Sequence, residues 1–296
     1  MTFLAIIAAL ALERALRAAD LEHFRRIRWF SLYQERLLQP LATVPGGNGP
    51  VGVALICLIP TVTVWLAVWL LAQFSVVLAF FLSVLVLLYC LGPGELLGQL
   101  KRYIAAHDAD ADEDTDPRQL AHDIMESETG LSAEDDTHRA VTEAALVRAN
   151  DRLFAVVFWF VLLGPAGAVL YRSADLLRRG VVLPGEEART GLAQHAVIFD
   201  GLLAWIPARL LAATYALTGS FEEAIADWKA YYEECTEPFF ETSEGVLSCA
   251  GCGALRISAG TTESGLAVVR SARGLLIRSL VLWLALLAVL TLAGLT

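Results

Sequence analysis

The longest uncharged stretch of the chain, residues 37–94, restricts its fold more than any other feature. Two further stretches, residues 153–171 and 279–296, also carry no charged side chain. A helix needs about 20 consecutive apolar residues to cross a bilayer. The overall composition agrees, because 56% of the residues are hydrophobic and soluble domains are nearer half apolar. The sequence therefore predicts an integral membrane protein.

The membrane-spanning segments are expected to be helices, because nothing alternates with the two-residue period of an outer-membrane barrel. We predict transmembrane helices over residues 51–72, 74–92, 153–171 and 276–295. Residues 196–217 are predicted to form a further membrane-embedded helix. Residues 1–19 form a short first helix that either spans or lies in the interface. The predicted fold class is an all-α, polytopic integral membrane helical bundle, with one membrane domain over residues 1–296.

The polar segments 97–150 and 218–275 are predicted to form cytoplasmic amphipathic helices, because apolar residues recur in them with the helical period. Positive residues mark cytoplasmic loops, and they flank the first hairpin at Arg25, Arg26, Arg28, Lys101 and Arg102. The net charge of −10 argues against nucleic acid as a partner. The acidic run at residues 107–116 lacks the central glycine and the distant glutamate of a calcium loop, so we expect a solvated loop.

Cys249 and Cys252 form a CxxC pair in a stretch rich in small residues. Such a pair supplies two of the four ligands of a zinc site, and Cys235 could be a third, but no histidine follows at finger spacing. The favoured interpretation is that these small residues allow helices to approach closely. We find no phosphate-binding loop and no nucleophile elbow, so no metal or cofactor is expected.

Polar side chains at the edges of the predicted spans are the remaining candidates for a site. Two interpretations stay open, because a bare charge in lipid is costly. The residues could pair across helices for stability, or they could line a polar pocket in which arginines bind a small anionic ligand. The candidates are Glu95, Arg102, Asp151, Arg152, Tyr171, Arg172, Asp175, Asp200 and Arg209.

Three blocks of the sequence resemble one membrane protein family. FDGLLAWIPARL (residues 199–210) is similar to the D…NWIPARL signature of the CobD/CbiB cobalamin-biosynthesis membrane proteins. FWFVLLGPAGAVLYRSADLL (158–177) and SEGVLSCAGCGALRI (243–257) resemble two further blocks of that family, in the same order. The resemblance implies an enzyme that forms an ATP-dependent amide between a corrinoid acid and an amino-alcohol or its phosphate. It also implies that Arg172 and Arg209 bind the ligand and that Asp200 orients Arg209.

Several positions depart from the biosynthetic enzymes. In our alignment their Glu-Asn pair becomes Val147 and Arg148, while Asp151 keeps the aspartate that follows, and the Asn of NWIPAR becomes Ala204. The start of the chain and the FWF…LGPAGAxxYR form are more similar to the AmpE branch. That branch belongs to the bacterial inner membrane and is linked to β-lactamase induction and peptidoglycan recycling.

We therefore expect a multi-pass regulatory or signalling protein of the bacterial inner membrane rather than an enzyme. The lipid bilayer, a small anionic ligand and a protein of cell-wall recycling or signalling are its expected partners. The alternative is a membrane-bound ligase of the cobinamide-phosphate synthase type. A transporter with helices broken at Pro60, Pro165 and Pro207 is a third class, and the lack of an inverted hydropathy repeat disfavours it.

Overall fold

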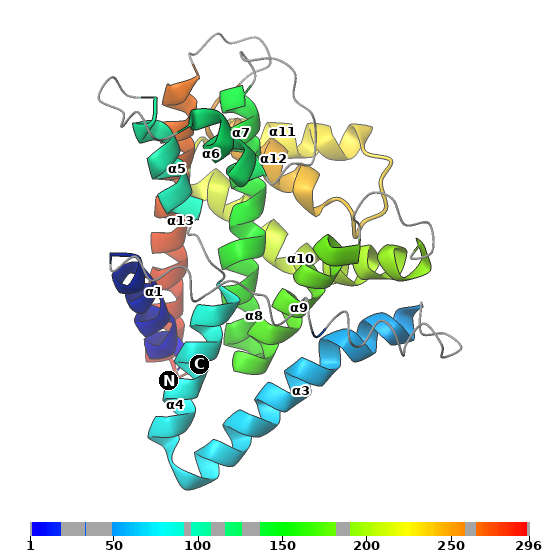
Figure 1. Ribbon diagram of the computed structural model, residues 1–296. Coiled ribbons are helices and arrows are strands. Elements are labelled where there is room, and N and C mark those ends of the chain that lie inside the picture. The colour runs from blue at the N-terminus through cyan, green and yellow to red at the C-terminus, as the bar shows by residue number, and fades with distance from the viewer. Residues whose placement is uncertain are drawn as a thin grey trace. The chain divides into compact units, whose positions relative to one another are not determined.

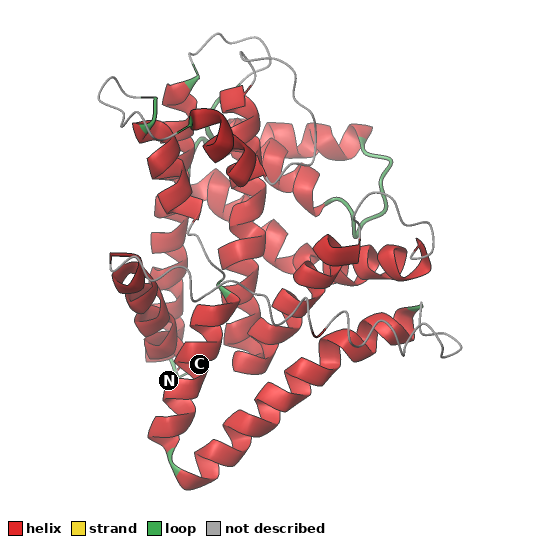
Figure 2. Cartoon of the chain, viewed as in Figure 1, coloured by secondary structure: helices red, strands yellow, loops and turns green. Residues whose placement is uncertain are grey.

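The computed structural model describes residues 2–18, 33, 49–91, 96–107, 116–125, 137–181, 190–257 and 265–294. Almost all of these residues are helical and none of them lies in a strand (Figure 2). The prediction of an all-helical fold is therefore confirmed. Glu95 and the arginines between residues 25 and 36 lie outside the described residues.

Three of the described helices are long and apolar enough to cross a membrane: α3 (Pro50–Phe74), α10 (Thr190–Thr218) and α13 (Leu266–Leu292). The shorter apolar helices are α1 (Thr2–Ala18) and α4 (Val76–Cys90). The exposed side chains of α3 include Trp65, Trp69 and Phe74. Large apolar side chains on an outer face suit a lipid environment. The chain is therefore a membrane protein.

A helical hairpin begins the membrane part. Pro50 is the first residue of α3, where its missing N–H removes no helical bond. The Ser75 side chain accepts a hydrogen bond from the Leu78 N–H and so caps α4. Figure 1 shows α3 and α4 as the two arms of this hairpin.

The predicted span 153–171 is divided between several elements in the structure. It begins in η3 (Asn150–Phe154), a π-helical turn, and continues through α8 (Ala155–Leu163) into α9 (Pro165–Val181). The break falls at Gly164, whose φ of +68° is costly for residues with a side chain. Pro165 then starts α9. The small-residue GPAGA sequence thus separates an apolar helix from a helix with a polar end.

The described helices cluster into two compact units. Unit 1 comprises Met1–Pro93, Ala155–Trp205 and Ala288–Thr296. Its core on α3, α9 and α10 includes Ile56, which is fully buried and whose carbonyl accepts a hydrogen bond from Tyr33. Unit 2 comprises Gly94–Phe154 and Ile206–Leu287.

The second unit holds the remaining helices, which are α5 (Leu96–Ala105), α6 (Pro117–Met125), α7 (Thr137–Ala149), α11 (Phe221–Glu234) and α12 (Ser243–Ala254). Hydrogen bonds connect α7 to α10 and α13 to α10. The Tyr215 hydroxyl donates to the Leu146 carbonyl, and the Trp283 indole donates to the Thr214 hydroxyl. These bonds satisfy polar groups that would otherwise be buried without partners.

Glycines of α12 allow other helices to approach it closely. A Cβ atom added at Gly245 would lie 2.4 Å from the Tyr231 ring, and one at Gly251 would lie 2.7 Å from Leu146. α11 and α12 lie side by side in Figure 1 and share many contacts. The interpretation of the stretch around Cys249 and Cys252 as a close-packing segment is confirmed.

Gly245→Ala is therefore expected to destabilise the protein by about 1–3 kcal/mol, the usual range for overpacking a filled site. Gly274→Ala on α13 is the matched control, because a Cβ there meets nothing within 4 Å. That control should be neutral or stabilising by about 0.5–1 kcal/mol, since alanine favours helix more than glycine does. Unfolding of both variants in detergent micelles checks the prediction, and equal stabilities would contradict it.

Candidate functional site

The polar end of α9 carries a cluster of arginines around a buried carboxylate. Arg172, Asp175 and Arg179 follow one another at spacings of three and four residues, which places them on one face of the helix. Asp175 is fully buried; one of its oxygens lies 2.7 Å from Arg172 Nη1 and the other 2.6 Å from Arg179 Nε. Burial alone would raise the pKa of Asp175, but the charges of Arg179 and Arg172 outweigh it and hold that pKa below its ordinary value. The carboxylate is therefore ionised at neutral pH.

A second ion pair connects α9 to α10 within unit 1. Arg178 Nε lies 2.9 Å from an oxygen of Asp200, whose side chain is 8% exposed. Among the described residues of unit 1, these ion pairs thus join three arginines to two carboxylates. The side chains of Arg172, Arg178 and Arg179 are 12%, 22% and 25% exposed. Each side chain is therefore partly open to solvent, and the N–H fork of arginine is well suited to binding an anion.

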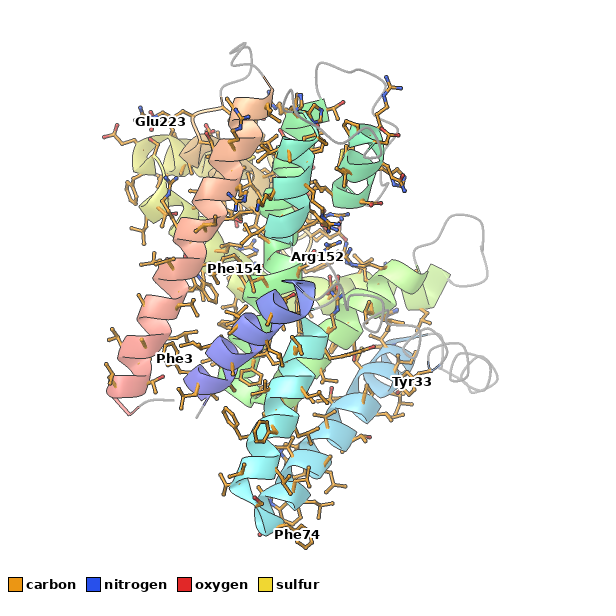
Figure 3. The ribbon with its side chains drawn as sticks, turned by 60° about the vertical axis from the view of Figure 1, so that its left-hand side comes forward. Phe3, Tyr33, Phe74, Arg152, Phe154 and Glu223 are labelled. Carbon is orange, nitrogen blue, oxygen red and sulfur yellow. The ribbon has the colours of Figure 1, made fainter. Side chains whose placement is uncertain are left out.

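The candidates in unit 2 lie partly on the π-helical turn η3. Asn150 and Asp151 are buried, and the Asn150 amide donates to an Asp151 oxygen at 3.3 Å. Arg152 donates to Gln99 of α5 at 3.1 Å; Arg152 and Phe154 mark this turn in Figure 3. Single π-helical turns within α-helices are frequent at functional sites. The turn is therefore a second candidate region.

Arg209 has a different set of partners from those expected. Its guanidinium donates to Ser243 at 3.0 Å, to the Tyr232 hydroxyl at 2.9 Å and to Thr242. These contacts hold the start of α12 and the end of α11 against α10. Asp200, which was expected to orient Arg209, instead pairs with Arg178. The contacts found for Arg209 are thus those of a residue that connects helices.

Of the nine candidates, unit 1 brings together Tyr171, Arg172, Asp175 and Asp200, and Tyr171 is fully buried. Unit 2 holds Asp151, Arg152, Arg209 and Arg102, of which Arg102 is exposed on α5. Sequence reasoning missed Arg178 and Arg179 as site residues. The spacing of Arg179 from Asp175 in the RSADLLRR segment was the signal for one of them. No pattern within either helix indicates that Arg178 pairs with Asp200.

Two histidines and a tyrosine meet between α5 and α7, outside the membrane helices. The Tyr103 hydroxyl lies 2.9 Å from His138 Nδ1, and the His107 and His138 ring centroids are 4.9 Å apart. Gly265 lies against the His138 ring, where a Cβ would come within 2.1 Å. Burial, and then the nearby His107, lower the pKa of His138 from 6.5. The neutral imidazole is therefore the form that this packing favours.

This cluster predicts a loss of stability in mild acid. Folding lowers the pKa of His138 from its value of about 6.5 in the unfolded chain. The stability that the neutral His138 contributes is therefore complete above that unfolded pKa, and it is lost as the pH falls through the lower pKa of the folded protein. His138→Asn should flatten that part of the profile of Tm against pH. His122→Asn is the control, because His122 is exposed on α6. Parallel profiles for the wild type and His138→Asn would contradict the prediction.

Comparison with known proteins extends over nearly the whole chain. A family model described as CobD/Cbib protein matches residues 6–292. The chain is 34% identical over 138 residues to the cobalamin biosynthesis protein CobD of Stutzerimonas stutzeri, covering 46% of this chain and 44% of that protein. It is 37% identical over 123 residues to CobD of Chromobacterium violaceum, covering 41% and 38%. With CobD of Pelobacter propionicus it is 25% identical over 220 residues, covering 73% and 67%.

These matches span less than half the length of the first two relatives. No solved structure matches the chain. The expected regulatory function of the AmpE type is wrong, because the matching family and these relatives are of the CobD kind. The expectation that the chain is not an enzyme has no support from them either. That expectation rested on a few substituted positions, among them Val147, Arg148 and Ala204, whereas the family match runs from one end of the chain to the other.

Proposed function

Because the chain belongs to the CobD/CbiB family, we propose that it is a membrane-bound ligase of the cobinamide-phosphate synthase type. In this proposal it joins a corrinoid carboxylic acid to an amino-alcohol or its phosphate. ATP transfers its terminal phosphoryl group to one carboxyl oxygen of the acid, and ADP leaves. The amine nitrogen then attacks the carboxyl carbon and loses a proton, the C–N bond forms, and phosphate leaves with that oxygen. The protein works in the bacterial inner membrane with its basic loops in the cytoplasm.

The observation that carries this proposal is the arginine–aspartate cluster of unit 1. Asp175 and Asp200 hold the guanidinium groups in place through contacts of 2.6–2.9 Å. A phosphate group prefers the planar fork of arginine, and preformed positive groups need no rearrangement during binding. The cluster therefore suits the phosphate of an amino-alcohol phosphate or of the nucleotide.

The structure explains one of the positions that depart from the enzymes. Arg148, which takes the place of the family's Asn, is buried and donates to the Met125 carbonyl at 2.6 Å. Asp151 is the carboxylate that this segment retains, and it lies on the π-helical turn. A positioned carboxylate can accept a proton, so Asp151 is a candidate proton acceptor within unit 2.

Complementation tests the proposal in cells. A bacterium lacking its own CobD should regain cobalamin synthesis when it expresses this chain. Arg172→Gln should lower the yield about tenfold or more, because it removes a charge-assisted contact of ~1.5–3 kcal/mol. Arg118→Gln, which removes the same charge from an exposed position on α6, should leave the yield unchanged. Wild-type protein present in the membrane without any cobalamin formed would count against the proposal.

A further inference from the structure

An exposed aromatic segment joins α11 to α12 within unit 2 (Figure 1). It covers residues 235–242, with the sequence CTEPFFET, and we name it the α11–α12 link. The Phe239 side chain is 58% exposed, and its ring lies edge-on to that of Phe240 with 5.6 Å between the centroids. A side chain of this size gains free energy when apolar groups cover it. The proposed function gives the link no role.

Hydrogen bonds attach the link to α10 at Arg209. The Arg209 guanidinium donates to the Thr242 hydroxyl and, at 2.9 Å, to the Tyr232 hydroxyl. The Thr242 hydroxyl donates in turn to the Phe239 carbonyl at 2.7 Å. The backbone at Phe239 is therefore held close to one point on α10.

The second half of α10 carries an apolar stripe on its outer side. Ile206, Leu210 and Leu217 are 46%, 46% and 68% exposed, and their spacing places them on one face of the helix. α10 is long and apolar enough to cross a membrane, and the exposed apolar side chains of such a helix face lipid. Because Arg209 directly precedes Leu210, the link is attached next to this lipid-facing stripe.

Contacts with α13 place the same half of α10 beside an uncharged stretch. The Thr218 and Ser279 hydroxyls lie 3.2 Å apart, and the Trp283 indole donates to Thr214 at 3.0 Å. α10 and α13 therefore run in opposite directions where they meet. α13 carries no charged residue after Arg278. From Thr218 back toward its middle, α10 thus follows the part of α13 that suits hydrocarbon.

Arg209 lies on the membrane side of the boundary between the charged and uncharged parts of α13. It precedes Thr218 by nine residues, which is about 13 Å along a helix axis. The link is bound to Arg209, so it reaches the same position along α10. Glu237 and Glu241 of the link are exposed, and carboxylates are costly in hydrocarbon. These charges keep the link in the headgroup layer, from which Phe239 can reach the acyl chains.

We propose that the α11–α12 link is a membrane-interface anchor whose partner is the surface of the lipid bilayer. Phe239 inserts between the first segments of the acyl chains, and Tyr232, which is 46% exposed, lies at the level of the headgroups. Aromatic side chains are favoured at this level, because their rings are apolar and tyrosine keeps its hydroxyl within reach of polar groups. Arg209 sets the depth of the anchor. The anchor goes beyond the proposed ligase function, since the arginine–aspartate cluster of unit 1 takes no part in it.

Photo-crosslinking of the full-length protein in phosphatidylcholine nanodiscs tests the anchor. Phe239→benzoylphenylalanine keeps an aromatic ring at the exposed position, so folding should be retained. The matched control is Gln119→benzoylphenylalanine on α6, a helix whose exposed side chains are polar. Peptide mass spectrometry should show at least about fivefold more lipid adduct at position 239 than at position 119, because only the first faces lipid. Equal yields, or no lipid adduct at position 239, overturn the proposal.

A fluorescence readout measures the depth of the link. In bilayers of phosphatidylcholine brominated near the start of the acyl chains, Phe239→Trp should show quenching beyond that of the wild type, and Gln119→Trp should not. Adding Arg209→Ala to Phe239→Trp should remove the additional quenching, because the link loses its attachment to α10. Additional quenching that persists overturns the role of Arg209 in setting the depth. Crosslinks from position 239 to a second copy of the chain in place of lipid overturn the choice of the bilayer as partner.

Discussion

Asp175→Asn should lower the free energy of unfolding by about 3 kcal/mol. The substitution keeps the shape of the side chain but leaves Arg172 and Arg179 facing a neutral amide in a buried position. Removing one partner of a buried ion pair typically costs about 3–5 kcal/mol. We expect the lower end of that range, because the side chains of both arginines keep some exposure to solvent.

Unfolding of purified protein in mixed micelles, followed by tryptophan fluorescence, measures this loss. Asp123→Asn is the matched control, because Asp123 is exposed on α6 and such substitutions usually stay within about 0.5 kcal/mol. A loss below about 1 kcal/mol for Asp175→Asn would show that the Asp175 carboxylate is not needed to hold Arg172 and Arg179 in place. The cluster would then have to be held together in another way.

Arg209→Ala should lower the free energy of unfolding by about 2–3 kcal/mol. The substitution removes hydrogen bonds to Ser243, Thr242 and Tyr232. The bond to Tyr232 is exposed to solvent and adds little, and the other two contribute roughly 1–1.5 kcal/mol each. Thr242 and Ser243 are buried, so their hydroxyls lose a donor in a place with little access to water. Arg209→Lys should restore only part of the loss, because one ammonium group lacks the planar fork of arginine.

Hydrogen exchange measures the local consequence of the Arg209→Ala substitution. The segment from residue 235 to residue 245 should exchange faster in the variant, because it loses its contacts with α10. Residues of α9 should exchange as in the wild type. Unchanged exchange over residues 235–245 would contradict the role of Arg209 in connecting these helices and would favour a direct role in binding a ligand.

The sequence predicted the helical membrane fold because hydrophobic length is a local property. The hairpin of α3 and α4 follows from an uncharged run with a short break at Ser75. The break at Gly164 and Pro165 within the predicted span 153–171 coincides with the glycine and proline of the GPAGA stretch. The pair formed by Arg178 and Asp200 could not be predicted. It depends on how α9 packs against α10, which no pattern within either helix records.

Two further features needed the folded chain. The π-helical turn at Asn150 inserts a residue into a helix without any change in composition that would announce it. Glu143 of α7 and Asp227 of α11, which are far apart in sequence, line the same acidic groove beside α12. The CxxC pair drew attention to this region, but the chemistry of its surroundings comes from carboxylates on other helices.

Direct detection of the amide product tests the central claim. Purified protein in detergent would be incubated with a corrinoid acid, an amino-alcohol phosphate and ATP with magnesium, and the mixture analysed by mass spectrometry. A ligase gives a product whose mass is the sum of the two substrates less one water, dependent on ATP and reduced in Arg172→Gln. Folded wild-type protein that forms no such product, under conditions in which a CobD relative does, would contradict the assignment.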